Sequence, residues 1–310
     1  MKITLFDVPS CGTLIIAGSN GLIGGVLTNY LTLLNEPPHC RKKTLEVGYK
    51  DISIAINELI KFSLERDYLS SLGKIYIIYA CGKGGFNIPE DIASQQVLVL
   101  SSLVNSLLER SRPEIRLLYL SSLGANLSTY DSNYKKMIEH NEAKVNQYGS
   151  STIIRLPGIW GYKQYGSQWT PCGLIGHLLS SSMTFREVLI FADLKTTRHY
   201  LSAEAVAKTI VKMIKYEGMA SFPRLQNLFS PTPLSISEII STIGFALSKR
   251  VYYKLQAGSA VDRESLFKMQ YDFVRDHLVL ESLSTEIKVA CLKVHQASPW
   301  LSHFTKPSSF

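Results

Sequence analysis

The chain has 310 residues, 45% of them hydrophobic, and a formal net charge of +8. This size and composition predict a globular protein with one large domain, or with one domain and a smaller lobe. The basic residues occur in small groups separated by acids, which argues against a nucleic-acid partner, and no apolar run approaches the roughly 20 residues that span a bilayer, which argues against a membrane protein.

The first predicted elements are a strand, a tight turn and a helix. Residues 13–18, TLIIAG, form a short apolar run that ends at a glycine. The segment that follows, NGLIGGVLTNYLTLL, has apolar residues at helical spacing. The residues that this helix would bury are Leu22, Ile23, Val26, Leu27 and Leu31.

Apolar strands and helices then alternate. A weaker strand candidate lies at 44–49, and the later predicted strands are 74–82, 114–122 and 151–158. The predicted helices are 51–69, 89–111, a helix from 133 that holds Tyr134, and 203–216. Continuous apolar strands that alternate with helices indicate the α/β class, a Rossmann-type doubly wound, mainly parallel sheet with helices on both faces.

A smaller C-terminal lobe is predicted where the alternation stops. It would contain a helix at 173–183, a helix that begins near Ser235 or Ser237, a short strand after that helix, and a tail helix at 283–295. The expected dinucleotide-binding domain is 1–165, with 190–225 returning to it, and the expected lobe is 166–189 with 226–310.

Cysteine usage bears on the compartment. Five scattered cysteines, odd in number and without C-x-x-C spacing, do not form a metal or disulfide framework. No export signal is evident, so we expect a cytoplasmic protein with no bound metal. The positive charge would also suit an anionic small substrate.

The turn after the first apolar strand has the pattern G-x-x-G-x-x-G. Glycines let the backbone approach a pyrophosphate, and the N-terminus of the next helix offers N–H groups and positive dipole. The pattern therefore predicts dinucleotide binding, with a turn chosen only for helix packing as the alternative. The predicted cofactor residues of the turn are Gly18, Ser19, Asn20, Gly21, Leu22, Ile23 and Gly24.

The choice between NAD and NADP depends on the end of the second strand, where an acid would bind the ribose and a base would bind a 2′-phosphate. Asp51 lies rather far downstream and Glu46 inside the strand, while Arg41, Lys42 and Lys43 precede it. The pattern favours NAD by a narrow margin and leaves NADP open.

Four features in the right order resemble the extended short-chain dehydrogenase/reductase family of nucleotide-sugar epimerases, dehydratases and reductases. They are the glycine turn, the strand IYIIYACG, Ser122 at the end of LLYLSS, and Tyr134 at the start of the next helix. IIRLPGIWGYKQYG, TTRHYLSAEAVAKTIVKMI and LSISEIISTIG are similar to later segments of that family. The resemblance covers nearly the whole chain.

The resemblance implies a role for each matching residue. Ser122 would hydrogen-bond the reacting sugar hydroxyl, and Tyr134 would exchange its proton while hydride moves between sugar and nicotinamide. Arg198, with Arg263 as a second candidate, would bind the diphosphate of a nucleotide-diphosphate sugar. The remaining cofactor positions implied are Ala80, Cys81, Gly82 and Pro157. The family also implies a role in polysaccharide biosynthesis and allows a homodimer.

The sequence departs from the family at one important position. The family pattern is Tyr-x-x-x-Lys, but here position 138, four residues after Tyr134, is Ile. Without that lysine a phenol with a pKa near ~10 is only about a thousandth ionised at pH 7. Two hypotheses follow: an epimerase or ketosugar reductase with an altered site, or a cofactor-binding homologue that has lost turnover and acts as a regulator or assembly partner.

Overall fold

The computed structural model describes residues 1–8, 12–34, 41–65, 74–82, 88–110, 114–126, 132–165, 168–216, 223–230, 232–256, 285–287 and 290. The chain divides into two compact units. The first comprises Met1–Leu156 and Val206–Leu228, and the second comprises Pro157–Ala205 and Phe229–Phe310. Within the described ranges, no helix has both the length and the apolar character to cross a bilayer.

A seven-stranded sheet in the order β12-β6-β5-β4-β2-β1-β3 forms the middle of the first unit. Its strands are β1 (Lys2–Val8), β2 (Gly12–Ala17), β3 (Arg41–Glu46), β4 (Ile75–Tyr79), β5 (Ile115–Ser122), β6 (Ser151–Leu156) and β12 (Leu225–Asn227). Pairing is parallel from β2 to β12, whereas β1 runs antiparallel to both β2 and β3. The predicted α/β class with a mainly parallel sheet is confirmed.

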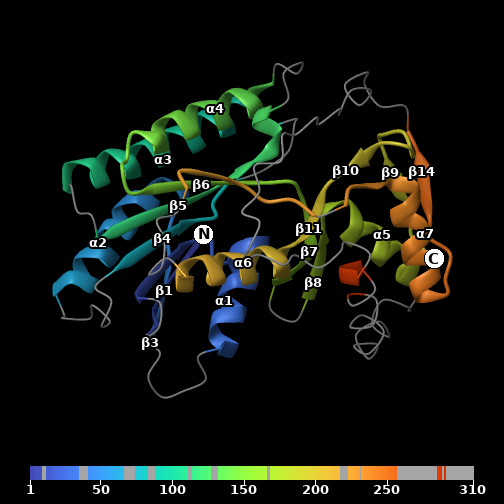
Figure 1. Cartoon of the computed structure of the whole chain (residues 1–310), viewed down its shortest axis with the longest axis horizontal. Coiled ribbons are helices and arrows are strands. Elements are labelled where there is room, and N and C mark those ends of the chain that lie inside the picture. The colour runs from blue at the N-terminus through green and yellow to red at the C-terminus, as the bar shows by residue number, and fades with distance from the viewer. Residues whose placement is uncertain are drawn as a thin grey trace, which may run out of the picture. The chain divides into compact units, whose positions relative to one another are not determined.

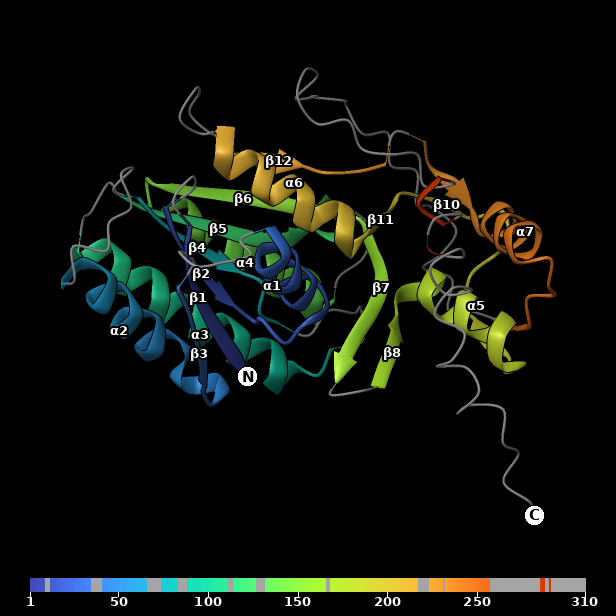
Figure 2. The ribbon, with the colours of Figure 1, turned by 90° about the horizontal axis from the view of Figure 1, so that it is seen from below.

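Helices cover both faces of this sheet. They are α1 (Leu22–Leu34), α2 (Ile52–Glu65), α3 (Glu90–Arg110), α4 (Asn133–Asn146) and α6 (Ala203–Tyr216). In Figures 1 and 2, α2, α3 and α4 lie on one face of the sheet, and α1 and α6 lie on the other. Two short 3-10 helices, η1 (Tyr49–Asp51) and η2 (Leu123–Asn126), precede α2 and follow β5.

Burial explains why the strands are so apolar. Every residue of β2 and of β4 is buried, because both faces of these central strands are covered. On the side of α2 and α3, the core packs Ile15, Ile77 and Leu117 with Ile56 and Leu103. The sheet is therefore a rigid support for the loops at its carboxyl edge.

The sequence analysis missed two strands of this sheet, the three-residue β12 and the longer β1. The sequence of β1, KITLFDV, mixes charged and apolar residues, yet Ile3, Leu5 and Phe6 are buried. Ile3 and Leu5 join the core beside α2. The insertion moves β3, the predicted second strand, to the edge of the sheet.

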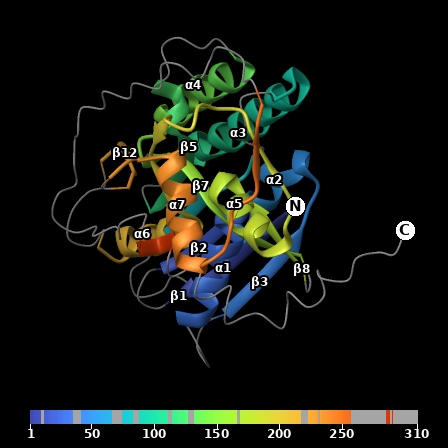
Figure 3. The same ribbon diagram turned by 90° about the vertical axis from the view of Figure 1, so that its right-hand side faces the viewer.

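The second unit contains short strands and two packed helices. The helices α5 (Gly173–Thr184) and α7 (Ile236–Leu247) lie side by side (Figure 3). The strands are β7 (Gly158–Tyr165), β8 (Gln168–Cys172), β9 (Val188–Ile190), β10 (Thr197–Arg198), β11 (Tyr200–Ser202), β13 (Leu234–Ser235) and β14 (Tyr253–Leu255). Of the two candidate positions Ser235 and Ser237, Ser235 caps α7, and it also forms a capping box with Glu238. Most of the expected tail helix at 283–295 lies outside the described residues.

Candidate functional site

The glycine turn joins β2 to α1, and two of its glycines are required by close packing. Gly18 has a φ of +88°, and a Cβ there would lie 2.5 Å from the carbonyl oxygen of Ala80. A Cβ at Gly24 would collide with the carbonyl of Gly18. Gly21 differs, because the nearest atom to its Cβ would be the Gly18 oxygen at 3.1 Å. Packing therefore demands glycine at positions 18 and 24 more strongly than at 21.

The start of α1 fits a pyrophosphate. The first helical hydrogen bond runs from the N–H of Gly25 to the carbonyl of Gly21 at 2.9 Å. The N–H groups of Leu22, Ile23 and Gly24 precede it and have no acceptor within the helix. Such groups, together with the positive end of the helix dipole, bind phosphate oxygens. The turn thus fits the diphosphate of a dinucleotide.

The segment after β4 lies against the turn. Ala80 N–H donates to the carbonyl of Ala17 at 3.0 Å, which extends the pairing of β4 with β2. Gly82 has a φ of +133°, and a Cβ there would lie 2.5 Å from Oε1 of the buried Gln96. Burial raises the pKa of the Cys81 thiol, so this cysteine stays protonated and is not a reactive nucleophile.

Ser122 and Tyr134 come together at the carboxyl end of β5. Ser122 ends the strand, and its Oγ accepts a hydrogen bond from the N–H of Gly124 at 3.0 Å. Tyr134 is the second residue of α4, whose N-cap Ser132 accepts from the N–H of Lys135 at 3.1 Å. Burial raises the pKa of Tyr134 above its ordinary value, and a hydrogen bond with Ser122 acts in the opposite direction.

Ile138 belongs to a small apolar cluster between α4 and α3. Its side chain is 2% exposed and packs with Ile88, Ala93 and Met137, and Tyr134 is packed against the same cluster. Lys135, one residue after Tyr134, forms an ion pair with Glu139 at 3.7 Å. The position that carries lysine in the family pattern is therefore part of the core of this chain.

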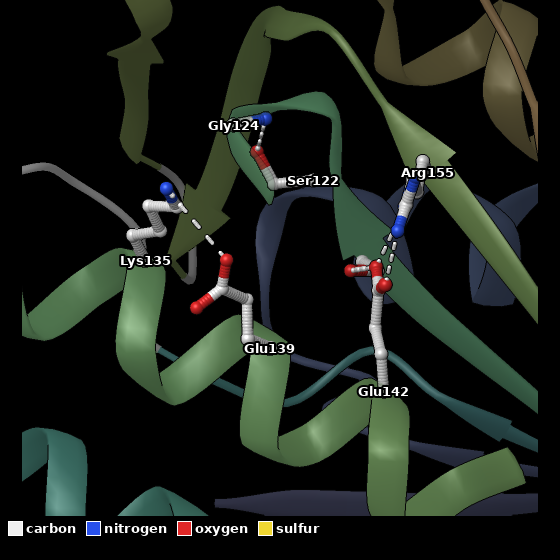
Figure 4. A network of polar contacts seen from close by, with 7 residues as sticks. Ser122, Gly124, Lys135, Glu139, Glu142 and Arg155 are labelled. Carbon is white, nitrogen blue, oxygen red and sulfur yellow. Dashed lines mark hydrogen bonds and ion pairs between the residues drawn. The ribbon is translucent and has the colours of Figure 1, made fainter. Parts of the chain in front are cut away.

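A buried polar network, which the sequence analysis missed, fastens α4 to the sheet (Figure 4). Glu142 is 6% exposed and accepts from the Nε of Arg155 at 2.9 Å and from the Oγ of Ser121 at 2.5 Å. A second bond joins the other carboxylate oxygen to Arg155. Since Ser121 precedes Ser122, the network positions the helix of Tyr134 against the strand of Ser122.

Three tyrosines of the first unit lie near these elements; Tyr79 and Tyr119 are buried, and Tyr49 is partly buried. Burial raises the pKa of Tyr79 and of Tyr119 well above the ordinary value, and raises the pKa of Tyr49 to about 12. The Tyr119 hydroxyl accepts from Asn141 Nδ2 at 3.3 Å, and the rings of Tyr79 and Tyr119 lie 6.1 Å apart. These phenols are neutral at physiological pH.

The remaining predicted residues fall in the second unit. Pro157 begins that unit, and the Gly158 that follows it pairs with Tyr200 of β11, while its N–H donates to the carbonyl of His199 at 3.3 Å. Arg198 is half-buried in β10, next to His199. Arg263 lies outside the described residues. The roles of Pro157, Arg198 and Arg263 stay predictions.

Comparisons with solved structures give the fold. The chain is similar to an epimerase from Methanothermobacter thermautotrophicus, with a TM-score of 0.66, 14% identity, and 94% of each chain covered. It is also similar to a UDP-glucose 4-epimerase from Thermotoga maritima solved with UDP-glucose, with a TM-score of 0.63, 13% identity, and 92% of this chain and 98% of the other covered. A dTDP-glucose 4,6-dehydratase from Bacillus anthracis solved with NAD has a TM-score of 0.63, 13% identity, and 94% and 99% coverage.

At these identities the likeness establishes the fold and nothing finer. The chain has the α/β fold of the extended short-chain dehydrogenases/reductases, which NAD-dependent nucleotide-sugar epimerases and dehydratases share. No protein-family sequence model matches the chain, and comparison with curated protein sequences found no match. The resemblance in the sequence is confirmed at the level of the fold.

Proposed function

We propose that the chain is an NAD(P)-dependent enzyme that acts on a nucleotide-diphosphate sugar, as an epimerase or a ketosugar reductase. The interaction of the Ser122 hydroxyl with Tyr134, which acts to lower the pKa of this phenol, supports this most directly. Because β2, β4 and β5 are parallel neighbours, their carboxyl ends share one edge of the sheet. A dinucleotide held at the glycine turn would extend across the end of β4 toward this hydroxyl pair.

The bound dinucleotide would supply the acceptor or donor of hydride. Ser122 would hydrogen-bond the reacting oxygen of the sugar, and Tyr134 would hold or give up a proton at that oxygen. Because burial raises the pKa of Tyr134, its hydroxyl keeps the proton at neutral pH. A protonated phenol is a proton donor, which is the role that reduction of a ketosugar needs.

Charge supports an anionic substrate. The chain has a net charge of +8, and Arg198 would offer bidentate hydrogen bonds to a diphosphate. Two structures of similar fold point the same way: the Thermotoga maritima enzyme was solved with UDP-glucose, and the compared dehydratase is named for dTDP-glucose. We propose a nucleotide-diphosphate sugar as the substrate class.

One observation favours the second candidate function, a cofactor-binding homologue without turnover. Ile138 is buried in the apolar cluster and supplies no charge to Tyr134, and burial raises rather than lowers the pKa of that phenol. A protein that binds the dinucleotide and turns over no substrate would fit these facts. The two candidates differ in turnover alone.

The first experiment identifies what the purified protein carries. Mass spectrometry of the molecules released on denaturation should show a nicotinamide dinucleotide and a sugar nucleotide. Turnover of that sugar nucleotide, or of its keto form, should then be measured for the native chain and for Tyr134→Phe. Loss of turnover in the variant supports the enzyme, whereas dinucleotide binding without turnover by the native chain supports the second candidate.

The second experiment tests the glycine turn. Gly21→Val should still fold, because the turn accommodates a Cβ at position 21 with a small shift. The variant should lose NAD(P) affinity, because the valine side chain would block the approach of the backbone to the pyrophosphate. Gly24→Val should instead unfold or destabilise the chain, since its Cβ meets backbone. Calorimetry measures NAD(P) binding and circular dichroism measures folding, so the two measurements distinguish the two variants. A folded Gly21→Val variant with native affinity would remove the turn from the cofactor site.

A further inference from the structure

The inserted strand β1 changes the neighbourhood of the glycine turn. In the usual doubly wound order, the strand that follows the first helix lies beside the glycine strand, and an acid about 20 residues beyond the glycines binds the ribose 2′-hydroxyl. Here β3 follows α1 but lies two places from β2, because β1 stands between them. At a spacing of about 4.8 Å per strand, β3 is roughly 9.6 Å from β2.

The start of β1 is fastened to the turn. The carbonyl of Lys2 accepts hydrogen bonds from the N–H groups of Gly18 at 3.1 Å and Ser19 at 3.0 Å. Lys2 N–H donates to Oδ1 of Asn20 at 3.3 Å, and the hydroxyl of Thr4 donates to Ser19 Oγ at 2.8 Å. These contacts place Lys2 directly beside the turn, where a neighbouring parallel strand would otherwise end.

The side chain of Lys2 shares a face with the turn. Thr4, two residues on and therefore on the same face of the strand, contacts Ser19. Lys2 and Glu46 are register partners, and Lys2 Nζ lies 2.9 Å from Glu46 Oε1. The two side chains are 47% and 73% exposed, so this ion pair exchanges for another partner at little cost.

We propose that Lys2 makes the turn select a dinucleotide that carries a 2′-phosphate on its adenosine ribose, that is NADP rather than NAD. This inference depends on the proposed dinucleotide site. An acid beside the turn would accept hydrogen bonds from a free 2′-hydroxyl and repel a phosphate. An ammonium group in that place binds phosphate as a point charge. Glu46 is the acid at the end of β3. It lies one strand farther from the glycine turn than Lys2, and its carboxylate forms an ion pair with the Lys2 ammonium.

The test measures binding of the adenosine half alone, without turnover. Calorimetry should compare 2′-phospho-ADP-ribose with ADP-ribose, and NADP with NAD, on the native chain and on Lys2→Gln. We expect the phosphorylated ligand to bind the native chain about tenfold or more tightly, and the variant to lose that preference. Lys144→Gln, which removes a partly exposed lysine near the end of α4, is the matched control and should keep the preference.

A second variant, at Glu46, should strengthen the preference for the phosphorylated ligand. Glu46→Gln removes the competing carboxylate, so affinity for 2′-phospho-ADP-ribose should rise a few-fold and affinity for ADP-ribose should stay constant.

If the native chain binds NAD as well as NADP, or if Lys2→Gln keeps the preference, the inference is wrong and the proposed dinucleotide site stands. If the folded native chain binds neither dinucleotide, both are wrong.

Discussion

The burial of Ile138 limits how a substitution at position 138 can stabilise the phenolate of Tyr134. The side chain is 2% exposed and packs against Ile88 and Ala93, so an ammonium group there would enter an apolar cluster. In the family pattern, a lysine one turn after the tyrosine stabilises the phenolate. This chain cannot regain that arrangement by one exchange, because the helix face that holds Tyr134 and Ile138 is packed on α3.

We therefore expect Ile138→Lys to destabilise the fold by several kcal/mol, because it buries a charge without a partner. Ile138→Leu, with the same volume and no charge, should cost less than about 1.5 kcal/mol. Urea unfolding of both variants measures the difference. An Ile138→Lys chain as stable as the native one, with its pH–rate curve moved toward neutral, would show that position 138 reaches the site.

The sequence could predict the residues of the site better than their surroundings. Ser122 and Tyr134 were predicted from the resemblance to the short-chain dehydrogenase/reductase family, and the structure brings them together. Whether position 138 borders a cleft or lies in the core depends on how α3 packs against α4, which periodicity cannot tell. The contact of Glu142 with Arg155 and Ser121 was missed for the same reason, since it joins three elements that meet only in the folded chain.

At the scale of elements, α4 is held to the sheet by this buried polar network. Glu142→Gln leaves the Arg155 guanidinium, whose side chain is 18% exposed, without its counter-charge. We expect a loss of about 2 to 4 kcal/mol in the free energy of unfolding. Glu139→Gln on the same helix breaks only a partly exposed ion pair with Lys135, so it should cost less than about 1 kcal/mol.

Denaturant unfolding of the two variants provides the comparison. Because both changes remove one carboxylate from α4, equal effects would mean that the network does not fasten the helix. The proposed positioning role also predicts that Glu142→Gln lowers turnover, since Tyr134 and Ser122 lie on the two elements that the network joins.

Periodicity predicted β2, β4, β5, β6 and the covering helices because each carries a continuous apolar run or a regular apolar stripe, but it missed the three-residue β12. It also missed β1, whose seven residues include a lysine and an aspartate and so look unlike a buried strand. The preference for NAD that the sequence favoured by a narrow margin assumed β3 beside the glycine strand. The position of β1 removes that assumption, which no local pattern could have revealed.

At the scale of the whole molecule, buried tyrosines determine the response to alkali. Burial raises the folded-state pKa of Tyr49 and of Tyr148 to about 12, and also raises that of Tyr79, Tyr119 and Tyr134. In the unfolded chain these phenols ionise near ~10. Between about pH 10 and 12 the unfolded chain therefore binds fewer protons than the folded one, and stability falls as pH rises.

We expect full stability from these groups below about pH 10 and a cooperative alkaline transition above it. Circular dichroism should lose its helical signal over the pH range in which these phenols ionise, because their raised folded-state pKa couples ionisation to unfolding. Tyr119→Phe should shift the transition to higher pH by removing one of the groups that drive it. Gradual ionisation with the helical signal unchanged would contradict this account.

The antiparallel pairing of β1 with β2 also bears on how the chain folds. The two strands are consecutive, and their register runs from Ile3 with Ala17 to Val8 with Gly12, so the paired ends are close in sequence. Each parallel pair in the same sheet can form only once the helical connection between its strands brings them together, so it forms more slowly. The glycine strand β2 therefore has a local partner, β1, with which it can pair early. We expect this strand pair to form first and the strands with long-range partners to add to it.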